Sequence, residues 1–352
     1  MVQSELTTIR NVLVFFTSVI VLGLLYLLQD LLIPLMLAMF LALLFQPGLV
    51  WFEKRKFPLW LSISIILVLF LTTIFFIGTV IYKTGADIYG EKEYILSQIN
   101  SKLSGVLEMY NRVTGKKLDL EHLFNDVTSG ISSEMIMTNS GSIFGTLGSL
   151  FEEFLLTSIY LVILLSGIMR YENYLHYLGG EGKSKKYIEA FEQIKNSIVS
   201  YMKVKLVISL FYGVGVTVIG LLFGLQFAFF WGFIGFVLNF LPVFGAIIGL
   251  VPVFIMGLIQ FDSVYTAITL NLIAYAYHFI LASVLEPVFL GNRTSLNTIV
   301  IIMGLLFWGF LWGIYGMFLS VPMMVLTKVI LSQIEGTDLF VRLLGVQEDT
   351  TK

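Results

Sequence analysis

The length of the uncharged segments constrains this chain more than any other feature of the sequence. Between Lys205 and Lys328 the only charged residues are Asp262, Glu286 and Arg293. An apolar run of about 18 or more residues is long enough to cross a bilayer as a helix. Hydrophobic residues make up 57% of the chain and charged residues only 12%, too few to cover the surface of a soluble fold. The sequence therefore predicts an all-α polytopic membrane protein.

The same composition argues against several other classes of protein. The formal net charge of −2 indicates no nucleic-acid partner, and the absence of cysteine removes disulfides, thiol nucleophiles and zinc–thiolate sites. The three histidines lie far apart and lack metal-ligand spacing. No phosphate-binding Gly-x-x-x-x-Gly-Lys-Ser/Thr loop and no hydrolase motif occurs. We therefore predict a protein that is not an enzyme, holds no metal or cofactor, and has membrane lipid as its surroundings.

Polar boundaries divide the chain into predicted membrane segments. Simple apolar spans are expected at residues 11–29, 31–52, 57–82, 151–169 and 206–223. With the longer stretches described below, they make about eight membrane segments. The predicted regions are residues 1–82 as scaffold spans, 83–145 as a small amphipathic helical subdomain outside the membrane, 146–205 as the fourth span and a basic cytoplasmic segment, 206–332 as a transport half, and 333–352 as a cytoplasmic tail.

The distribution of lysine and arginine predicts the orientation. Cytoplasmic loops collect these residues, so the basic segments 53–56 and 170–205 are expected inside the cell. Residues 83–135 have an acidic excess and lie one span further on, which places them outside. Both termini are then expected in the cytoplasm.

Two stretches in the C-terminal half do not fit simple spans. Residues 227–260 and 298–327 are uncharged, too long for one perpendicular helix of about 20 residues and too short for two. Each contains Trp-Gly-x-x-Gly, starting at Trp231 and Trp312, with a proline about two turns later. Two broken or re-entrant helical hairpins, related as an inverted repeat, would fit this pattern and would place a transport site between them. A single kinked helix in each stretch is the alternative.

Several motifs resemble those of one known family. They are Leu-Asn-Phe-Leu-Pro-Val-Phe-Gly-Ala-Ile-Ile-Gly-Leu-Val-Pro at 238–252, Leu-Glu-Pro with a following Gly-Asn at 285–292, Trp-Gly-Phe-Leu-Trp-Gly-Ile-Tyr-Gly at 308–316, and Val-Pro at 321–322. Pro34, Pro47 and the basic residues 54–56 also fit. From residue 31 to residue 330, the chain resembles the autoinducer-2 exporter family of bacterial membrane proteins.

This resemblance implies an inner-membrane transporter that exports a small polar solute, a signalling molecule such as autoinducer-2 used in quorum sensing. Some members are associated with sodium/proton exchange, so an antiporter is an alternative, as is a passive channel. The resemblance also implies a homo-oligomer, a pentamer, in which the hairpin-bearing half moves against a scaffold. The family is functionally mixed, and the substrate does not follow from the fold.

Polar residues inside the apolar stretches are the candidates for a substrate or ion pathway. An ionisable group such as Glu286 at membrane depth costs a few kcal/mol unless it is paired or wet. We predict that it carries a proton or cation, so that a proton or sodium gradient drives transport; the alternative is an interfacial glutamate paired with Arg293. Asn239, three residues before Pro242, is expected near a hairpin tip, where its amide meets a solute or only caps the backbone.

Four further residues complete the predicted pathway. Ser320 and Pro322 take the corresponding place in the second long stretch. Asn271 and His278 are seven residues apart, so both face one side of their helix. That face is expected to meet protein or water, and the two side chains serve either contacts between helices or the solute.

Overall fold

The computed structural model describes residues 2–114, 140–168, 171–242, 244–290, 297–332 and 343–345. Within these ranges the regular structure is helical and no β-strand occurs. Five helices are long and apolar enough to cross a membrane: Gln29–Lys54, Leu59–Gly90, Ile188–Leu222, Val264–Phe289 and Ile299–Ser332. The prediction of a helical membrane protein is confirmed.

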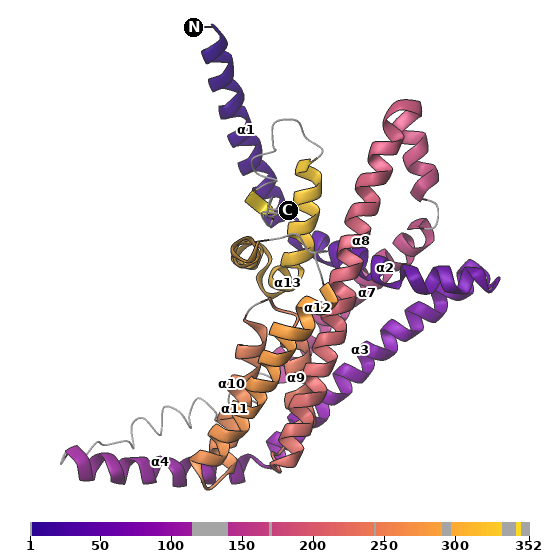
Figure 1. The fold of residues 1–352 in the computed structure, drawn as a ribbon. Coiled ribbons are helices and arrows are strands. Elements are labelled where there is room, and N and C mark those ends of the chain that lie inside the picture. Colours follow the sequence, from indigo (N-terminus) through magenta and orange to yellow (C-terminus); the bar gives the residue numbers. More distant parts are fainter. Residues whose placement is uncertain are drawn as a thin grey trace.

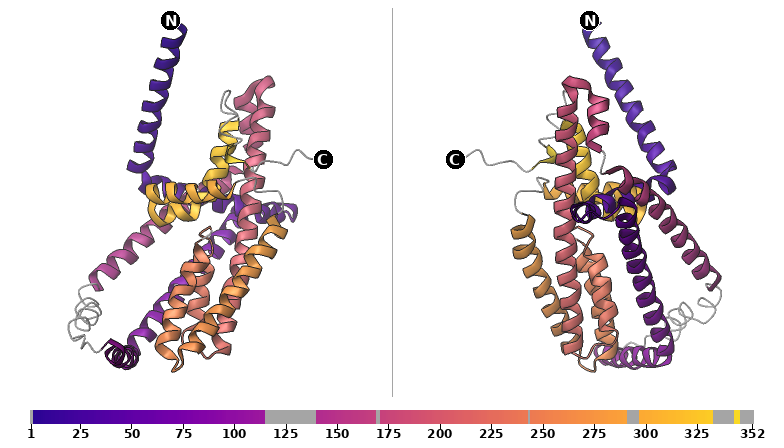
Figure 2. Two further views of the ribbon diagram at one scale, coloured as in Figure 1. Left: turned by 60° about the vertical axis from the view of Figure 1, so that its left-hand side comes forward. Right: turned by 90° about the vertical axis from the view of Figure 1, so that its right-hand side faces the viewer.

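The N-terminal helices begin and end near the predicted polar boundaries. α1 (Val2–Leu27) and α2 (Gln29–Lys54) are separated by a single residue, Leu28. α3 (Leu59–Gly90) follows after a short turn. α1 projects away from the rest of the molecule, and most of its described apolar side chains are exposed (Figures 1 and 2). In a membrane this apolar surface faces lipid or other protein.

The middle of the chain contains α4 (Lys92–Thr114), α7 (Ser140–Ile168) and α8 (Tyr171–Leu222). Part of the predicted extramembrane subdomain, residues 115–139, lies outside the described residues, as does most of the predicted tail. The sequence analysis placed Lys205 at the end of a polar segment that is expected in the cytoplasm. Lys205 is buried inside α8, because the helix continues unbroken from the polar stretch into the apolar one.

The first long stretch forms two short helices, α9 (Ala228–Leu238) and α10 (Gly245–Gln260), which pack against each other. The chain reverses direction between them, at the predicted asparagine and proline. α9 also packs closely on α8, because Gly213 and Gly232 let the two backbones approach. This stretch is a helical hairpin, not a single kinked helix.

After the hairpin, α11 (Val264–Ile280) runs back along α8 and α10. It continues through a π-helical turn, η1 (Leu281–Leu285), into the short α12 (Glu286–Leu290). α4 lies across the far end of this group, and the Lys102 ammonium group donates a hydrogen bond to the carbonyl of Phe261 in the turn between α10 and α11 (Figure 1).

The second long stretch is α13 (Thr298–Ser332), which is broken at Trp312 and Gly313. Gly313 has φ +58° and ψ −140°, a combination that is practically restricted to glycine. The two arms of α13 fold back on each other, since a side chain added at Gly304 would meet Met324. This stretch is therefore a second helical hairpin.

The two Trp-Gly-x-x-Gly motifs occupy different positions in their hairpins. Trp231 lies within α9, before the first break, whereas Trp312 forms the second break itself. The predicted correspondence between the motifs therefore does not extend to the position of the turn.

The buried side chains form two separate cores. The scaffold core joins α2, α3, α7, α13 and the part of α8 up to Met202. The arm core joins α8 from Val204 onward with α9, α10, α11 and η1. α8 is the element that both cores share, and Figure 1 shows it running through both groups of helices.

The contact between α8 and α9 gives a first testable prediction. A Cβ atom at Gly232 would lie 1.9 Å from Thr217 Oγ1 and 2.5 Å from the Gly213 carbonyl, so Gly232→Ala forces the helices apart. We expect a loss of about 1–3 kcal/mol of stability, measured by thermal unfolding of the purified protein in detergent. Gly78→Ala in α3, where the added carbon meets nothing within 4 Å, is the control and should leave stability unchanged or slightly higher. Equal midpoints for the two variants would contradict this packing.

Candidate functional site

The tip of the α9–α10 hairpin brings a polar side chain into the buried interior. Asn239 is only 2% exposed, and its Nδ2 donates a hydrogen bond of 2.9 Å to Oγ of the fully buried Ser209 on α8. The contact arises because α9 runs antiparallel to α8 and ends at this level of the long helix. The predicted position of Asn239 near a hairpin tip agrees with the structure.

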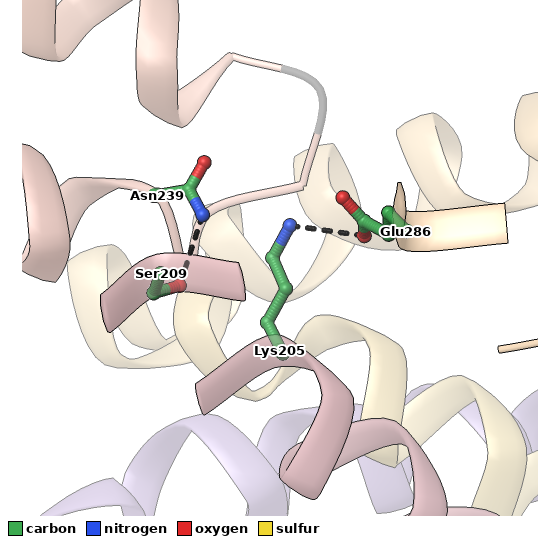
Figure 3. Close-up of polar contacts among 4 residues, drawn as sticks. All are labelled: Lys205, Ser209, Asn239 and Glu286. Atoms are coloured by element: carbon green, nitrogen blue, oxygen red, sulfur yellow. Dashed lines mark hydrogen bonds and ion pairs between the residues drawn. The ribbon is translucent and has the colours of Figure 1, made fainter. Parts of the chain in front are cut away.

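An ion pair lies one helical turn before Ser209 on α8. Lys205 precedes Ser209 by four residues, so both point from the same face of the helix. Its Nζ lies 3.2 Å from Oε1 of Glu286, and the side chains are 8% and 21% exposed. Figure 3 shows the ion pair beside the Asn239–Ser209 hydrogen bond. We call Lys205, Ser209, Asn239 and Glu286 the polar cluster.

The π-turn η1 positions Glu286 in this cluster. A π-helical turn contains an extra residue and therefore changes the rotational phase of the residues that follow it. Glu286 comes directly after this turn and faces α8, which lies next to both η1 and α12. Such turns frequently occur at functional sites.

The partner of Glu286 is the main point that the sequence analysis missed. Arg293, the proposed partner, lies outside the described residues, and Lys205 makes the ion pair. The available signal was the position of Lys205 at the start of an apolar run, four residues before a serine. Neighbouring Lys203 is exposed, and the sequence alone does not show which of the two lysines faces inward.

Asn271 and His278 both face the interior of the arm, as their spacing predicted. Asn271 Nδ2 donates a hydrogen bond of 3.2 Å to the Leu250 carbonyl and so links α11 to α10. The His278 ring packs edge-on against Tyr212 of α8, with 5.1 Å between the ring centroids. Nδ1 of His278 is buried without a hydrogen-bond partner among the described residues.

The second hairpin differs from the prediction at its tip. Pro322 is buried inside the second arm of α13, well after the break at Trp312 and Gly313. Ser320 is also buried there, and its hydroxyl donates to the Met317 carbonyl of the same helix, at 2.8 Å. The expectation that these two residues mark the tip is wrong, because the glycine with positive φ makes the reversal and the proline is accommodated within the helix.

Both the tip and the second arm of α13 are tied to the scaffold. Trp312 Nε1 donates a hydrogen bond of 3.0 Å to the Leu25 carbonyl at the end of α1. The Tyr315 hydroxyl donates to a carboxylate oxygen of Glu153 on α7. Within the described part of the chain, Ser320 and Pro322 make no hydrogen bond or ion pair with the polar cluster, which is built from α8, the first hairpin and α12.

The polar cluster offers hydrogen-bonding groups of four kinds. No group of three or more His, Asp or Glu side chains with metal-ligand geometry occurs among the described residues. The cluster instead provides an ammonium group, an amide, a hydroxyl and a carboxylate. Apolar helices surround these groups, so each polar contact is made in a low dielectric.

The fold and the cluster define a multi-pass membrane protein with a buried polar site, and sequence comparison gives the family. The family model for the AI-2E family transporter matches residues 15–336, nearly the whole chain. The chain therefore belongs to the AI-2E transporter family, as the motifs at 238–252 and 308–316 predicted.

Individual relatives align over most of their length. A protein of Haemophilus influenzae is 25% identical, with 99% of both chains covered. YhhT of Escherichia coli strain K12 is 26% identical, over 97% of this chain and 96% of YhhT. The AI-2 transport protein TqsA of the same strain is 22% identical, over 87% of both chains.

The ion pair gives a second prediction. Lys205→Met and Glu286→Gln each leave one charge in a largely apolar interior, so each should lower the thermal unfolding midpoint in detergent. The double variant removes both charges and should be more stable than Lys205→Met alone, by about 1–3 kcal/mol. Lys203→Met, on the exposed face of α8, is the control and should resemble the parent. If the effects of the two single substitutions simply add in the double variant, the two side chains are not coupled.

Proposed function

We propose that this protein is a secondary transporter that moves a small polar solute across the membrane, and that the polar cluster forms part of the solute path. The observation that carries the proposal is the convergence of a helical break, a buried amide and a partly buried ion pair in an otherwise apolar group of helices. Polar and ionisable groups in such surroundings are costly, and in membrane proteins they mark solute or ion pathways.

The dimensions of the first hairpin support this proposal. α9 has 11 residues and α10 has 16, which correspond to lengths of about 16 Å and 24 Å. Both are shorter than a hydrocarbon core of about 30 Å, so the hairpin fits a re-entrant element whose tip ends inside the bilayer. Secondary transporters commonly place their substrate sites beside such discontinuous helices.

Autoinducer-2 is the solute that we propose, with export from the cell as the direction. The support is membership of the AI-2E family and similarity to TqsA, which is named as an AI-2 transport protein. We further propose that the protein acts in the bacterial inner membrane, with both termini in the cytoplasm, as a homo-oligomer, a pentamer. The exposed apolar surface of α1 is compatible with contact to either lipid or another copy.

A proton or sodium gradient is the proposed energy source. In the present conformation the Glu286 carboxylate is held by the Lys205 ammonium group, so a role in carrying a proton or cation requires the ion pair to open. His278, whose Nδ1 has no hydrogen-bond partner among the described residues, is the second titratable group of the arm that we propose for such a role.

Transport assays with sealed vesicles test the function. The purified protein in liposomes should move autoinducer-2 faster than protein-free liposomes, with saturation, and an imposed pH or sodium gradient should drive accumulation. Asn239→Ala and Ser209→Ala remove the amide–hydroxyl contact and should lower transport about tenfold, the effect of losing one buried hydrogen bond. Asn100→Ala, on an exposed position of α4, is the matched control and should transport like the parent.

Three outcomes would contradict parts of this proposal. Vesicles with protein that release autoinducer-2 no faster than empty vesicles exclude that solute. Fast flux without saturation or gradient-driven accumulation indicates a passive channel. Full activity of both Asn239→Ala and Ser209→Ala places the solute path elsewhere.

A further inference from the structure

We propose that Lys205 is an anion-recognition residue, and that a small organic anion replaces Glu286 as the partner of its ammonium group. This inference rests on the proposed function, because it narrows the small polar solute to one that presents a negatively charged oxygen group. It assigns the roles in the ion pair unequally: Lys205 binds the solute, and Glu286 occupies the position of the solute while the site is empty.

The unequal roles follow from burial and from the elements that carry the two residues. The Lys205 side chain is 8% exposed and belongs to α8, the helix shared by both cores. The Glu286 side chain is 21% exposed and lies on α12, a helix of five residues next to a π-turn. Glu286 is thus closer to water and lies on a short element, whereas the Lys205 side chain is enclosed by its neighbours on the long helix.

The groups around Lys205 are mostly hydrogen-bond donors. A lysine ammonium group has three N–H donors, and the hydrogen bond to Glu286 Oε1 uses one of them. Asn239 uses one of its two Nδ2 protons for Ser209, and Ser209 accepts that bond, so its hydroxyl proton remains to be donated. Apart from Glu286, the side chains of the polar cluster therefore suit a ligand rich in oxygen acceptors.

The N-terminus of α10 adds positive potential at the same place. The turn between α9 and α10 is tight: a Cβ atom at Gly245 would lie 1.8 Å from the Leu238 carbonyl and 3.1 Å from Asn239 Cα. The first residue of α10 is thus held against Asn239, and the N–H groups of this 16-residue helix begin beside the cluster. The N-terminus of a helix favours negative charge, and here it supplements a buried ammonium group.

Exchange of one carboxylate for another keeps the site electrically balanced. A buried ammonium group without a partner is costly, so Glu286 leaves at low cost only when another anion arrives. The solute thereby opens the ion pair at the junction of the scaffold and arm cores. A neutral solute of the same shape cannot replace the charge of Glu286. The site would therefore distinguish anionic solutes from neutral ones.

Glu286→Gln makes the inference testable without knowledge of the natural solute. This variant keeps the shape of the side chain and leaves Lys205 without its carboxylate partner. We expect sodium acetate, added to the purified variant in detergent, to raise its thermal unfolding midpoint by several degrees, because acetate displaces the uncharged glutamine side chain and pairs with the Lys205 ammonium group. Acetamide, which is neutral and of similar shape, should produce no comparable rise. The parent should respond less to acetate, because Glu286 competes with it.

The double variant Lys205→Met/Glu286→Gln reports the non-specific effect of the salt and should show no acetate-specific rise. Lys203→Met combined with Glu286→Gln keeps Lys205 and should respond like Glu286→Gln alone. A response of the double variant equal to that of Glu286→Gln, or equal responses to acetate and acetamide, would overturn the inference. Because this measurement needs no transport, a failure of autoinducer-2 transport with a positive acetate result would contradict the proposed solute but not the anion site.

Discussion

The rest of the structure depends on the need to satisfy backbone polar groups away from water. Inside a bilayer an unpaired N–H or C=O group has no solvent partner, so a chain can break its helices only where other protein groups cover the break. The turn between α8 and α9 also has its backbone groups paired by a side chain from another element. The Gln260 side chain accepts a hydrogen bond from the Gln226 N–H and donates one to the Gly224 carbonyl, each 2.7 Å long.

Close packing of glycines then determines where the polar groups meet. Gly213 and Gly232 let α9 approach α8 closely, and this approach places the end of α9 beside Ser209. The same face of α8 carries Lys205 one turn earlier, where α11, η1 and α12 bring Glu286. The polar cluster is thus a consequence of antiparallel packing along one helix, and a wider separation of α8 and α9 would disrupt it.

The ion pair lies on the helix that contributes to both cores. It is located where α8 passes from the scaffold core, which includes Met202, to the arm core, which includes Val204 and Ile208. A change in its pairing therefore acts on the single helix that both cores share. In the proposed exchange of Glu286 for a solute anion, this is the point at which solute binding would act on the relative position of the two groups of helices.

The sequence by itself determined the membrane class, the family, the helical boundaries near Leu28 and the break around Asn239, because long apolar runs and helix breakers act locally. It did not determine the partner of Glu286. The charge of Lys205, next to an apolar run, is equally typical of a helix end, and the sequence does not show which helix faces it. The sequence also did not select the break in the second long stretch, where Gly313 and Pro322 both predict one, because only the fold-back of α13 on itself shows which residue makes the reversal. Tertiary structure decided these points because the cost of a buried charge or of a broken helix depends on which groups from distant segments cover it.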